Sequence, residues 1–412
     1  MRRRLTGFAA IAAFLLLPSA VAEARPPSCA AMKSWLGYGG SASGLQVVDA
    51  ETGRVVCRKA AKRRRSLASN MKLFTTAAVL GRLGPGARIA TRVMSDGTLR
   101  RNGVLRGSLY LKGGGDPALG TPAFYDRFRG GLGTNLFALK SRLRARGIEA
   151  VTGRLYADDT IFDRLRGVAD SGFATSPYIG PLSGLAFNSG YSGPGGRRFA
   201  ADPAKVAARA LARSLRATGV RVRARVALRQ APQDAETVAV VRSPTIAQLA
   251  DATNVPSNNY YAEMLAKLLG AGFGGEGTTR EGTAVIARFA RGLGSGVRAV
   301  DGSGLTRSNR ASPAQVVALL RAMWRTEAGD AFIQSLAIAG SEGTVASRME
   351  GTAAAGRCRA KTGTLTGVSA LSGYCFNRSG RVMAFSILMN GVRNLSAAHR
   401  GQDRIAAAVA SY

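Results

Sequence analysis

The residues best suited to chemistry are a serine and a lysine near the start of an apolar run. Ser69 lies three residues before Lys72, and the run that contains Lys72 extends to Leu80. Positions three apart share one face of a helix, so this hydroxyl and this amine would lie side by side. An adjacent amine base can activate a serine hydroxyl for nucleophilic attack. The pair therefore predicts Ser69 as a nucleophile and Lys72 as its base.

A second string, Ser257-Asn258-Asn259, offers another hydroxyl and a carboxamide. A hydroxyl both donates and accepts a proton, so Ser257 is predicted to relay a proton to a leaving amine. The Asn259 amide is predicted to donate to the substrate backbone.

A third string, Lys361-Thr362-Gly363-Thr364, adds a second amine next to a glycine. Lys361 would supply a fixed positive charge, and Gly363 would let the substrate approach a strand edge closely. The backbone N–H groups of Thr364 and Ser69 would form an oxyanion hole. The hydroxyls of Thr362 and Thr364 would hold a terminal carboxylate. This set of groups predicts acyl transfer at a C-terminal peptide bond.

Each string alone has an ordinary structural interpretation. A serine at a helix start is usually an N-cap, and a lysine-threonine-glycine string is usually a turn. All three strings in this order favour catalysis instead. His399 is the only histidine, so a Ser-His-Asp hydrolase is not expected.

The elements that must position these strings fall into two blocks. Strands are predicted at 45–50, 54–57, 357–364, 368–376 and 382–389, and helices after Ser69, after Ser257, and at 278–291, 313–324 and 397–410. Residues 25–91 and 243–412 are therefore predicted to form one catalytic α/β (α+β) unit, with an antiparallel sheet between helical layers. Residues 92–242, rich in glycine and short strands, are predicted to be an inserted strand-rich domain with a helix at 203–218.

The N-terminal residues are typical of a secretory signal. Three arginines precede the apolar stretch 8–17, and a small-x-small site ends at Ala24. The stretch is too short to span a bilayer, although a retained anchor is the alternative. Cleavage near Ala24 and a periplasmic location are predicted.

The composition is strongly basic, with 58 Lys and Arg against 24 Asp and Glu and a formal charge of +34. Nucleic acid is not an expected partner, because the arginines are scattered and the chain is predicted to be exported. The densest run is 58–65. A solvated basic surface is the simplest interpretation, and salt-sensitive attraction to an anionic cell-wall polymer is the alternative.

The four cysteines allow three disulfide pairings. An oxidising compartment favours bridging. Cys358 and Cys375 flank the Lys361 string on two predicted strands, which favours a cross-strand bridge and would leave Cys29 with Cys57. No cluster of cysteine and histidine is present, so no metal site is expected.

The three strings match the S-x-x-K, S-x-N and K-T-G set of penicillin-interacting serine enzymes. The chain more specifically resembles the class C low-molecular-mass penicillin-binding proteins, the D-alanyl-D-alanine carboxypeptidase/endopeptidases, from about residue 40 to its end. Further strings carry this resemblance: 109–117, Asp158-Asp159 with Phe162 and Asp163, 301–305, 340–344 and 360–367.

The resemblance implies an acyl-enzyme on Ser69, formed at D-Ala-D-Ala bonds or D-configured cross-links of peptidoglycan, with penicillins as covalent inhibitors and no cofactor. Asp158 and Phe162 would recognise the amine end of a diaminopimelate side chain, and Arg307 its carboxylate. The chain departs from the family between Lys72 and Ser257, where a third domain of larger members is expected to be missing. Glu342 also replaces a usual aspartate.

Two other functions share some of these features. A β-lactamase would carry the same three strings, but the chain has no E-x-x-L-N string for an efficient deacylating base. A catalytically inactive, basic cell-wall-binding protein is the alternative from another class.

Overall fold

The computed structural model describes residues 27–377 and 380–412. Its largest sheet has six antiparallel strands in the order β15-β16-β17-β18-β1-β2. These strands are β15 (Ala337–Ile338), β16 (Cys358–Leu365), β17 (Val368–Phe376), β18 (Val382–Asn390), β1 (Ala42–Asp49) and β2 (Val55–Lys59). The two N-terminal strands thus complete a sheet that the C-terminal strands begin.

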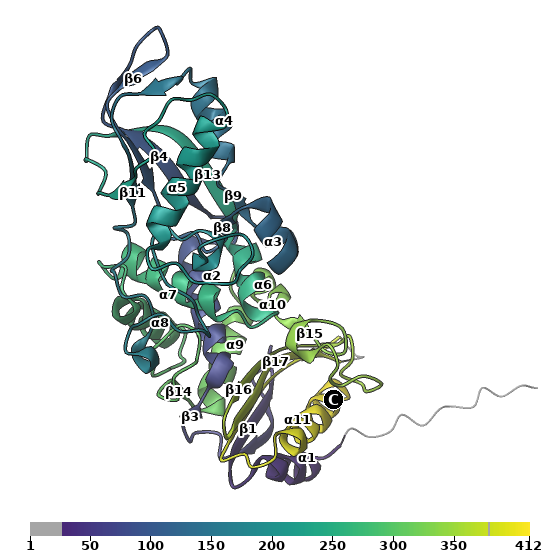
Figure 1. The fold of residues 1–412 in the computed structure, drawn as a ribbon. Coiled ribbons are helices and arrows are strands. Elements are labelled where there is room, and N and C mark those ends of the chain that lie inside the picture. The colour runs from purple at the N-terminus through teal and green to yellow at the C-terminus, as the bar shows by residue number, and fades with distance from the viewer. Residues whose placement is uncertain (1–26, 378–379) are drawn as a thin grey trace, which may run out of the picture.

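Both faces of this sheet are covered by helices (Figure 1). Neighbouring residues of a strand alternate between two hydrophobic cores: Val47, Leu371 and Phe385 belong to one, and Val48, Ala370 and Ala384 to the other. This alternation is what a strand buried on both faces requires. The outer layer consists of α1 (Cys29–Leu36) and α11 (Leu395–Ala410). The inner layer consists of α2 (Met71–Leu83), α6 (Ile246–Asn254), α7 (Asn259–Phe273), α8 (Thr279–Gly292), α9 (Pro313–Trp324) and α10 (Gly329–Gln334).

Helix α2 lies at the centre of the inner layer. Every residue from Met71 to Leu80 is buried, so the helix is enclosed on all sides rather than on one stripe. Its polar members, Lys72, Thr75 and Thr76, all form hydrogen bonds inside the protein. The Ser69 string is therefore attached to the most constrained helix of the fold.

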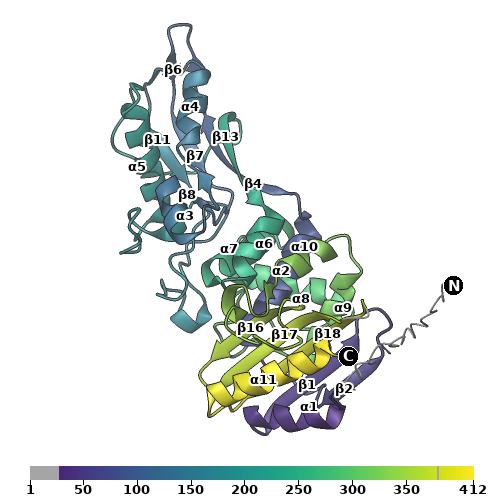
Figure 2. The ribbon, with the colours of Figure 1, turned by 90° about the vertical axis from the view of Figure 1, so that its right-hand side faces the viewer.

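The segment between α2 and α6 forms a second body, which stands off the helical layer in Figure 2. Its five-stranded sheet runs β12 (Ala227–Leu228), β11 (Leu155–Asp158), β7 (Leu109–Lys112), β4 (Arg88–Ser95) and β13 (Glu236–Thr245). Helices α4 (Ala138–Ala145) and α5 (Pro203–Arg216) pack on it and share a separate hydrophobic core. The remaining short elements are α3 (Pro122–Phe128), β3 (Arg65–Ser66), β5 (Thr98–Leu99), β6 (Val104–Arg106), β8 (Leu119–Gly120), β9 (Thr134–Asn135), β10 (Ala150–Val151) and β14 (Arg310–Ala311).

Part of the inserted segment packs back onto the catalytic unit. Phe162, Val168, Ile179 and Leu182 belong to the same core as α2 and α7, not to the core of the inserted sheet. The loop 159–191 therefore packs mainly on the catalytic unit, although the sequence places it within the insertion and its residues Leu185 and Phe187 belong to the core of the inserted sheet.

The predicted α/β architecture, with an antiparallel sheet between helical layers and a strand-rich insertion, is confirmed. The structure contains disulfides between Cys29 and Cys57 and between Cys358 and Cys375. The predicted signal segment, 1–24, lies outside the described residues. Among the described helices, none combines the length and apolar character needed to cross a membrane.

Candidate active site

The structure brings Ser69 and Lys72 together at the N-terminal end of α2. Ser69 occupies a 3₁₀ turn (Ala68–Asn70) that leads directly into the helix. The Lys72 Nζ donates to Ser69 Oγ over 3.0 Å, to Asn259 Oδ1 over 2.7 Å and to the Ser303 carbonyl over 2.7 Å. All three N–H bonds of the ammonium group thus have acceptors, and one acceptor is the candidate nucleophile.

The surroundings of Lys72 make it a usable base. Its side chain is fully buried, and burial lowers its pKa from 10.5 to about 7, although the charges of Asp301 and Glu263 act in the opposite direction. A lysine near neutrality can accept the Ser69 proton at physiological pH.

Two residues beside the catalytic strings have left-handed backbone conformations that side chains disfavour. Ala68, directly before Ser69, has φ of 45°, and Ser257 has φ of 61°. Such conformations cost about 1–3 kcal/mol each and persist only where the surrounding structure imposes them. Backbone strain of this kind is often found at active sites.

The third string forms the exposed edge of the large sheet. Strand β15 pairs only with Arg359 and Ala360, so β16 has no strand partner on that side from Lys361 onward. Cys358 accepts from Ala339 on the β15 side, and the alternation along a strand places the N–H of Thr364 on the same edge. This edge can therefore bind an extended peptide through backbone hydrogen bonds.

Gly363 lies in close contact with the Ser69 turn. A Cβ atom there would lie 2.8 Å from the Leu67 carbonyl and 3.0 Å from the Ser69 nitrogen. The glycine thus allows the Ser69 turn to approach β16. The Asn70 side chain fixes the same approach by donating to the Lys361 carbonyl over 2.9 Å. As a result, the Ser69 nitrogen lies against the strand that presents the Thr364 N–H.

Lys361 is fully buried beneath this edge, and its Nζ donates to the Thr362 carbonyl over 3.2 Å. Burial, and to a lesser extent the charge of Lys72, lower its pKa well below 10.5. A nearby anion, such as a bound carboxylate, would favour its charged form. The Thr362 hydroxyl donates to the hydroxyl of Thr344 over 2.7 Å.

Ser257 lies two residues before α7, and Asn258, not Ser257, caps that helix by accepting from the Tyr261 N–H. The Ser257 hydroxyl makes no hydrogen bond among the described residues. Asn259 connects the second string to the first, since its oxygen accepts from Lys72. Its amide nitrogen donates to the carbonyl of Tyr178, on the loop 159–191, over 3.1 Å.

Arg307, Asp158 and Phe162 lie in different surroundings. The exposed Arg307 donates to the Thr366 carbonyl, just beyond β16. Asp158 is 1% exposed, and its carboxylate accepts from Thr160 and from the Ala231 N–H inside the inserted body. Phe162 is buried in the core. No hydrogen bond or ion pair between described residues joins Asp158 to the three strings.

A buried carboxylate that the sequence analysis missed holds the base in place. Glu263, one helical turn after Asn259, accepts from the N–H groups of Gly302 and Ser303 over 3.0 and 2.7 Å. The Ser303 carbonyl is in turn the third acceptor of Lys72. The sequence offered one signal for Glu263, its spacing of four residues from Asn259, which places both on one helix face. The residues whose backbone N–H groups Glu263 binds could not be identified from the sequence.

These features define a serine acyl-transfer enzyme of the penicillin-binding type: a buried lysine beside a serine, a carboxamide on the neighbouring helix, and a lysine-threonine-glycine strand edge. Comparison with known proteins agrees. The chain belongs to the D-Ala-D-Ala carboxypeptidase 3 (S13) family, whose model matches residues 37–195 and 192–412. The family predicted from the three strings is thus confirmed.

Individual relatives support the same assignment. The chain is 32% identical over 462 aligned residues to the D-alanyl-D-alanine carboxypeptidase of Actinomadura sp. (strain R39), covering 90% of this chain and 82% of that one. It is 30% identical to carboxypeptidase DacB of Mycolicibacterium smegmatis, covering 84% and 75%. Among solved structures, penicillin binding protein 4 from Haemophilus influenzae superposes with a TM-score of 0.74 at 20% identity, covering 91% of this chain and 97% of that one. This last likeness concerns the fold.

Proposed function

We propose that this chain is a serine DD-peptidase that cleaves D-Ala-D-Ala bonds and D-configured cross-links of peptidoglycan. The observation that carries this proposal is the buried Lys72 ammonium, 3.0 Å from Ser69 Oγ and with a pKa near 7. The family membership and the free edge of β16 support the peptide class of the substrate.

The reaction begins when neutral Lys72 accepts the Ser69 proton as Oγ attacks the carbonyl carbon of the scissile bond. The N–H groups of Ser69 and Thr364 stabilise the resulting oxyanion. When the tetrahedral intermediate collapses, the C–N bond breaks, and the leaving amine takes a proton from Lys72 through the Ser257 hydroxyl. The acyl group remains on Ser69 until water attacks the ester and releases the peptide acid.

The substrate's terminal carboxylate would bind beside Lys361, Thr362 and Thr364. A carboxylate there would favour the charged form of the buried Lys361, whose pKa is otherwise lowered by burial. Penicillins carry a carboxylate next to a reactive amide and would acylate the same serine. Arg307 lies at the end of the same strand edge and is available for a second carboxylate.

Several finer points belong to this proposal. The chain would be exported through its N-terminal segment and act in the periplasm.

We also infer that the third domain of larger members is absent. Two observations support this absence: the family model matches in two segments that meet at 192–195, and the alignment with the Actinomadura enzyme spans 462 positions against 412 residues here.

The test is covalent labelling of the purified protein with a fluorescent penicillin, beside Ser69→Ala. We expect slow-releasing label on the wild type alone, together with release of D-alanine from a peptide that ends in D-Ala-D-Ala. Rapid turnover of the drug would indicate a β-lactamase instead. A folded wild-type protein that takes no label would leave only the cell-wall-binding alternative.

A further inference from the structure

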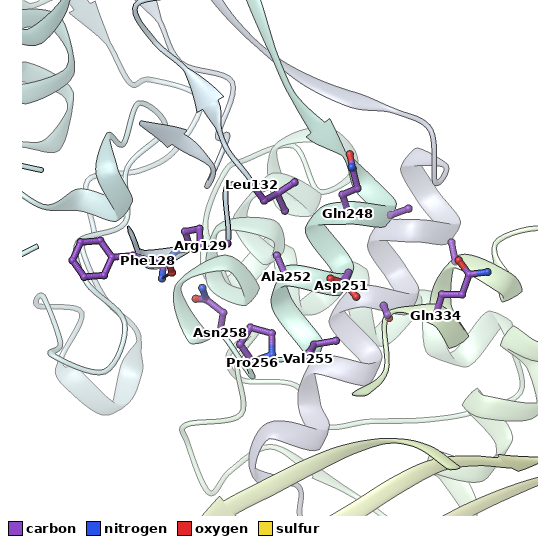
Figure 3. A pocket seen from close by; sticks show the side chains of 14 residues that line it. Phe128, Arg129, Leu132, Gln248, Asp251, Ala252, Val255, Pro256, Asn258 and Gln334 are labelled. Carbon is purple, nitrogen blue, oxygen red and sulfur yellow. Dashed lines mark hydrogen bonds between the residues drawn. The ribbon is translucent and has the colours of Figure 1, made fainter. Parts of the chain in front are cut away.

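Beside Ser257 lies a cleft of about 690 Å³, between α6, α10 and the segment that follows α3. Pro256 and Asn258, the two neighbours of Ser257, both line it. Figure 3 shows Arg129 and Asn258 towards one end of this cleft, and Asp251 and Gln334 towards the other. The cleft is thus built by both bodies of the protein and opens next to the catalytic strings.

A smaller pocket of about 270 Å³ continues from the Arg129 end. It shares Arg129, Pro256 and Asn258 with the cleft and extends to Tyr178 and Tyr260. Tyr178 also contacts the catalytic string, because its carbonyl accepts from the Asn259 amide. Arg129 therefore stands where two hollows meet beside the active site.

Arg129 is held in place but lacks a charge partner. Its guanidinium donates to the Phe128 carbonyl over 2.8 Å and to Ser189 Oγ over 3.1 Å, and it lies 5.8 Å from the centre of the Tyr261 ring. Its Nε is buried without an acceptor, and none of the ion pairs between described residues includes it. A half-buried cation with an unused N–H group is costly unless an anion completes it.

A second unused donor lines the same pocket. Tyr260 is 3% exposed, and its hydroxyl has no hydrogen-bond partner among the described residues. Burial raises the pKa of this phenol, so it stays a neutral donor. The positive charge of Arg129 lowers that pKa, but by less than burial raises it. Tyr260 also belongs to the first turn of α7, where the helix end favours negative charge.

We propose that Arg129 and Tyr260 form an anion subsite next to Ser257, which binds a carboxylate of the peptide substrate upstream of the scissile bond. The inference rests on the proposed DD-peptidase function and adds a specificity determinant to it. This subsite differs from the predicted carboxylate contacts at Arg307 and at Thr362 and Thr364, which lie on or just beyond β16.

The test uses the full-length protein with two synthetic peptides that end in D-Ala-D-Ala. They are identical except that one carries a free side-chain carboxylate upstream of the scissile bond and the other its amide. The wild type should hydrolyse the carboxylate peptide with a kcat/KM about 10- to 100-fold higher, the size expected of a charge-assisted hydrogen bond. Arg129→Gln should abolish this preference by lowering kcat/KM for the carboxylate peptide alone.

Acylation by a fluorescent penicillin reports on the catalytic centre separately and should be unchanged in Arg129→Gln. The matched control is Arg127→Gln, an exposed arginine in the last turn of α3, two residues before Arg129, which should keep the preference. Tyr260→Phe should weaken the preference for the carboxylate peptide. Arg129→Lys, the substitute if Arg129→Gln fails to fold, should keep part of this preference. Equal loss on both peptides, equal loss in the Arg127 control, or a wild type without preference overturns the subsite. A wild type that neither hydrolyses peptide nor takes penicillin overturns the proposed function instead.

Discussion

At the scale of single residues, the site depends on the protonation state of Lys72. Burial lowers its pKa to about 7, so the amine is mostly charged below that pH and cannot accept the Ser69 proton. We expect the rate of penicillin acylation to fall about tenfold per pH unit below this pKa and to reach a plateau above it. Stopped-flow labelling from acid to alkaline pH measures this profile, and a flat rate would contradict the role of Lys72 as the base.

Glu263 should set the position of that profile. Its negative charge, like that of Asp301, raises the pKa of Lys72 against the effect of burial. Burial also raises the pKa of Glu263 itself to about 7, so its charge is fully present only above that pH. Glu263→Gln removes the charge and keeps the size of the side chain, so the midpoint of the acylation profile should move to lower pH. Glu350→Gln, an exposed carboxylate elsewhere, is the matched control. A lower plateau without any shift of the midpoint would limit Glu263 to holding the Gly302–Ser303 backbone.

The contrast between Lys72 and Glu263 shows what single residues reveal before the structure is known. Ser69, Lys72, Asn259 and Lys361 were named from their strings because the chemistry predicted for them belongs to their own side chains at recognisable spacings. Glu263 binds the backbone N–H groups of Gly302 and Ser303 and acts on Lys72 through the Ser303 carbonyl. Backbone contacts of this kind do not require a particular residue type at 302 or 303, so the sequence does not indicate them.

At the scale of elements, β16 must be rigid because its free edge presents the Thr364 N–H. Cys358 and Cys375 face each other at its first residue, and their disulfide closes a separation of 17 residues. Replacing both by alanine should lower the free energy of unfolding by about 3 kcal/mol and slow acylation. Replacing Cys29 and Cys57 should destabilise the protein without slowing acylation, because that bridge joins α1 to the far edge strand. Thermal melts and labelling rates separate the two effects.

The loop 159–191 is attached to α7 by an ion pair between the fully buried Lys267 and the half-buried Asp163. Lys267 Nζ lies 2.5 Å from Asp163 Oδ1. Asp163→Asn would leave that ammonium without a counter-charge and should cost about 3–5 kcal/mol, whereas the double variant with Lys267→Met should recover much of it.

The pH dependence of this variant follows from the sign of the shift. Burial lowers the pKa of Lys267 below 10.5 in the folded protein. The unfolded chain therefore binds more protons between the folded pKa and 10.5, and stability rises with pH in that window. The loss in Asp163→Asn should shrink towards alkaline pH. Urea unfolding at several pH values tests this, and a loss independent of pH would point to packing rather than charge.

The elements also show where sequence patterns stop being sufficient. Strands β16 to β18 and helices α8, α9 and α11 lie close to their predicted ranges, because apolar periodicity and glycine boundaries are local signals. The loop 159–191 carries no such periodicity, and its attachment through Phe162 and Ile179 to the core around α7 depends on long-range packing. The hydrogen bonds of Asp158 to Thr160 and Ala231 depend on the same long-range packing, whereas its predicted role came from the family resemblance.

At the scale of the whole molecule, the excess of 58 basic over 24 acidic residues covers both bodies rather than one site. The densest basic run illustrates this. Arg65 is buried and donates to four backbone carbonyls, of Ala42, Ser43, Ala60 and Arg63, so it stabilises the fold instead of binding a polymer. The other basic residues of the run are exposed, but so are most arginines of the inserted body. Attraction to an anionic cell-wall polymer would therefore be distributed.

A basic charge spread over both bodies and a single binding patch lead to different expectations for binding to cell walls. Raising ionic strength from about 0.01 M to about 1 M shortens the Debye length from about 30 Å to about 3 Å, so sedimentation with insoluble cell walls should be lost while penicillin acylation persists. Two variants, each with five exposed basic residues changed to glutamine, should weaken sedimentation by similar amounts. One changes the basic run (Arg58, Lys59, Lys62, Arg63, Arg64), and the other changes the inserted body (Arg213, Arg216, Arg221, Arg223, Arg225). Loss in only one of the two variants would locate a binding patch there, and salt-independent sedimentation would exclude an electrostatic association altogether.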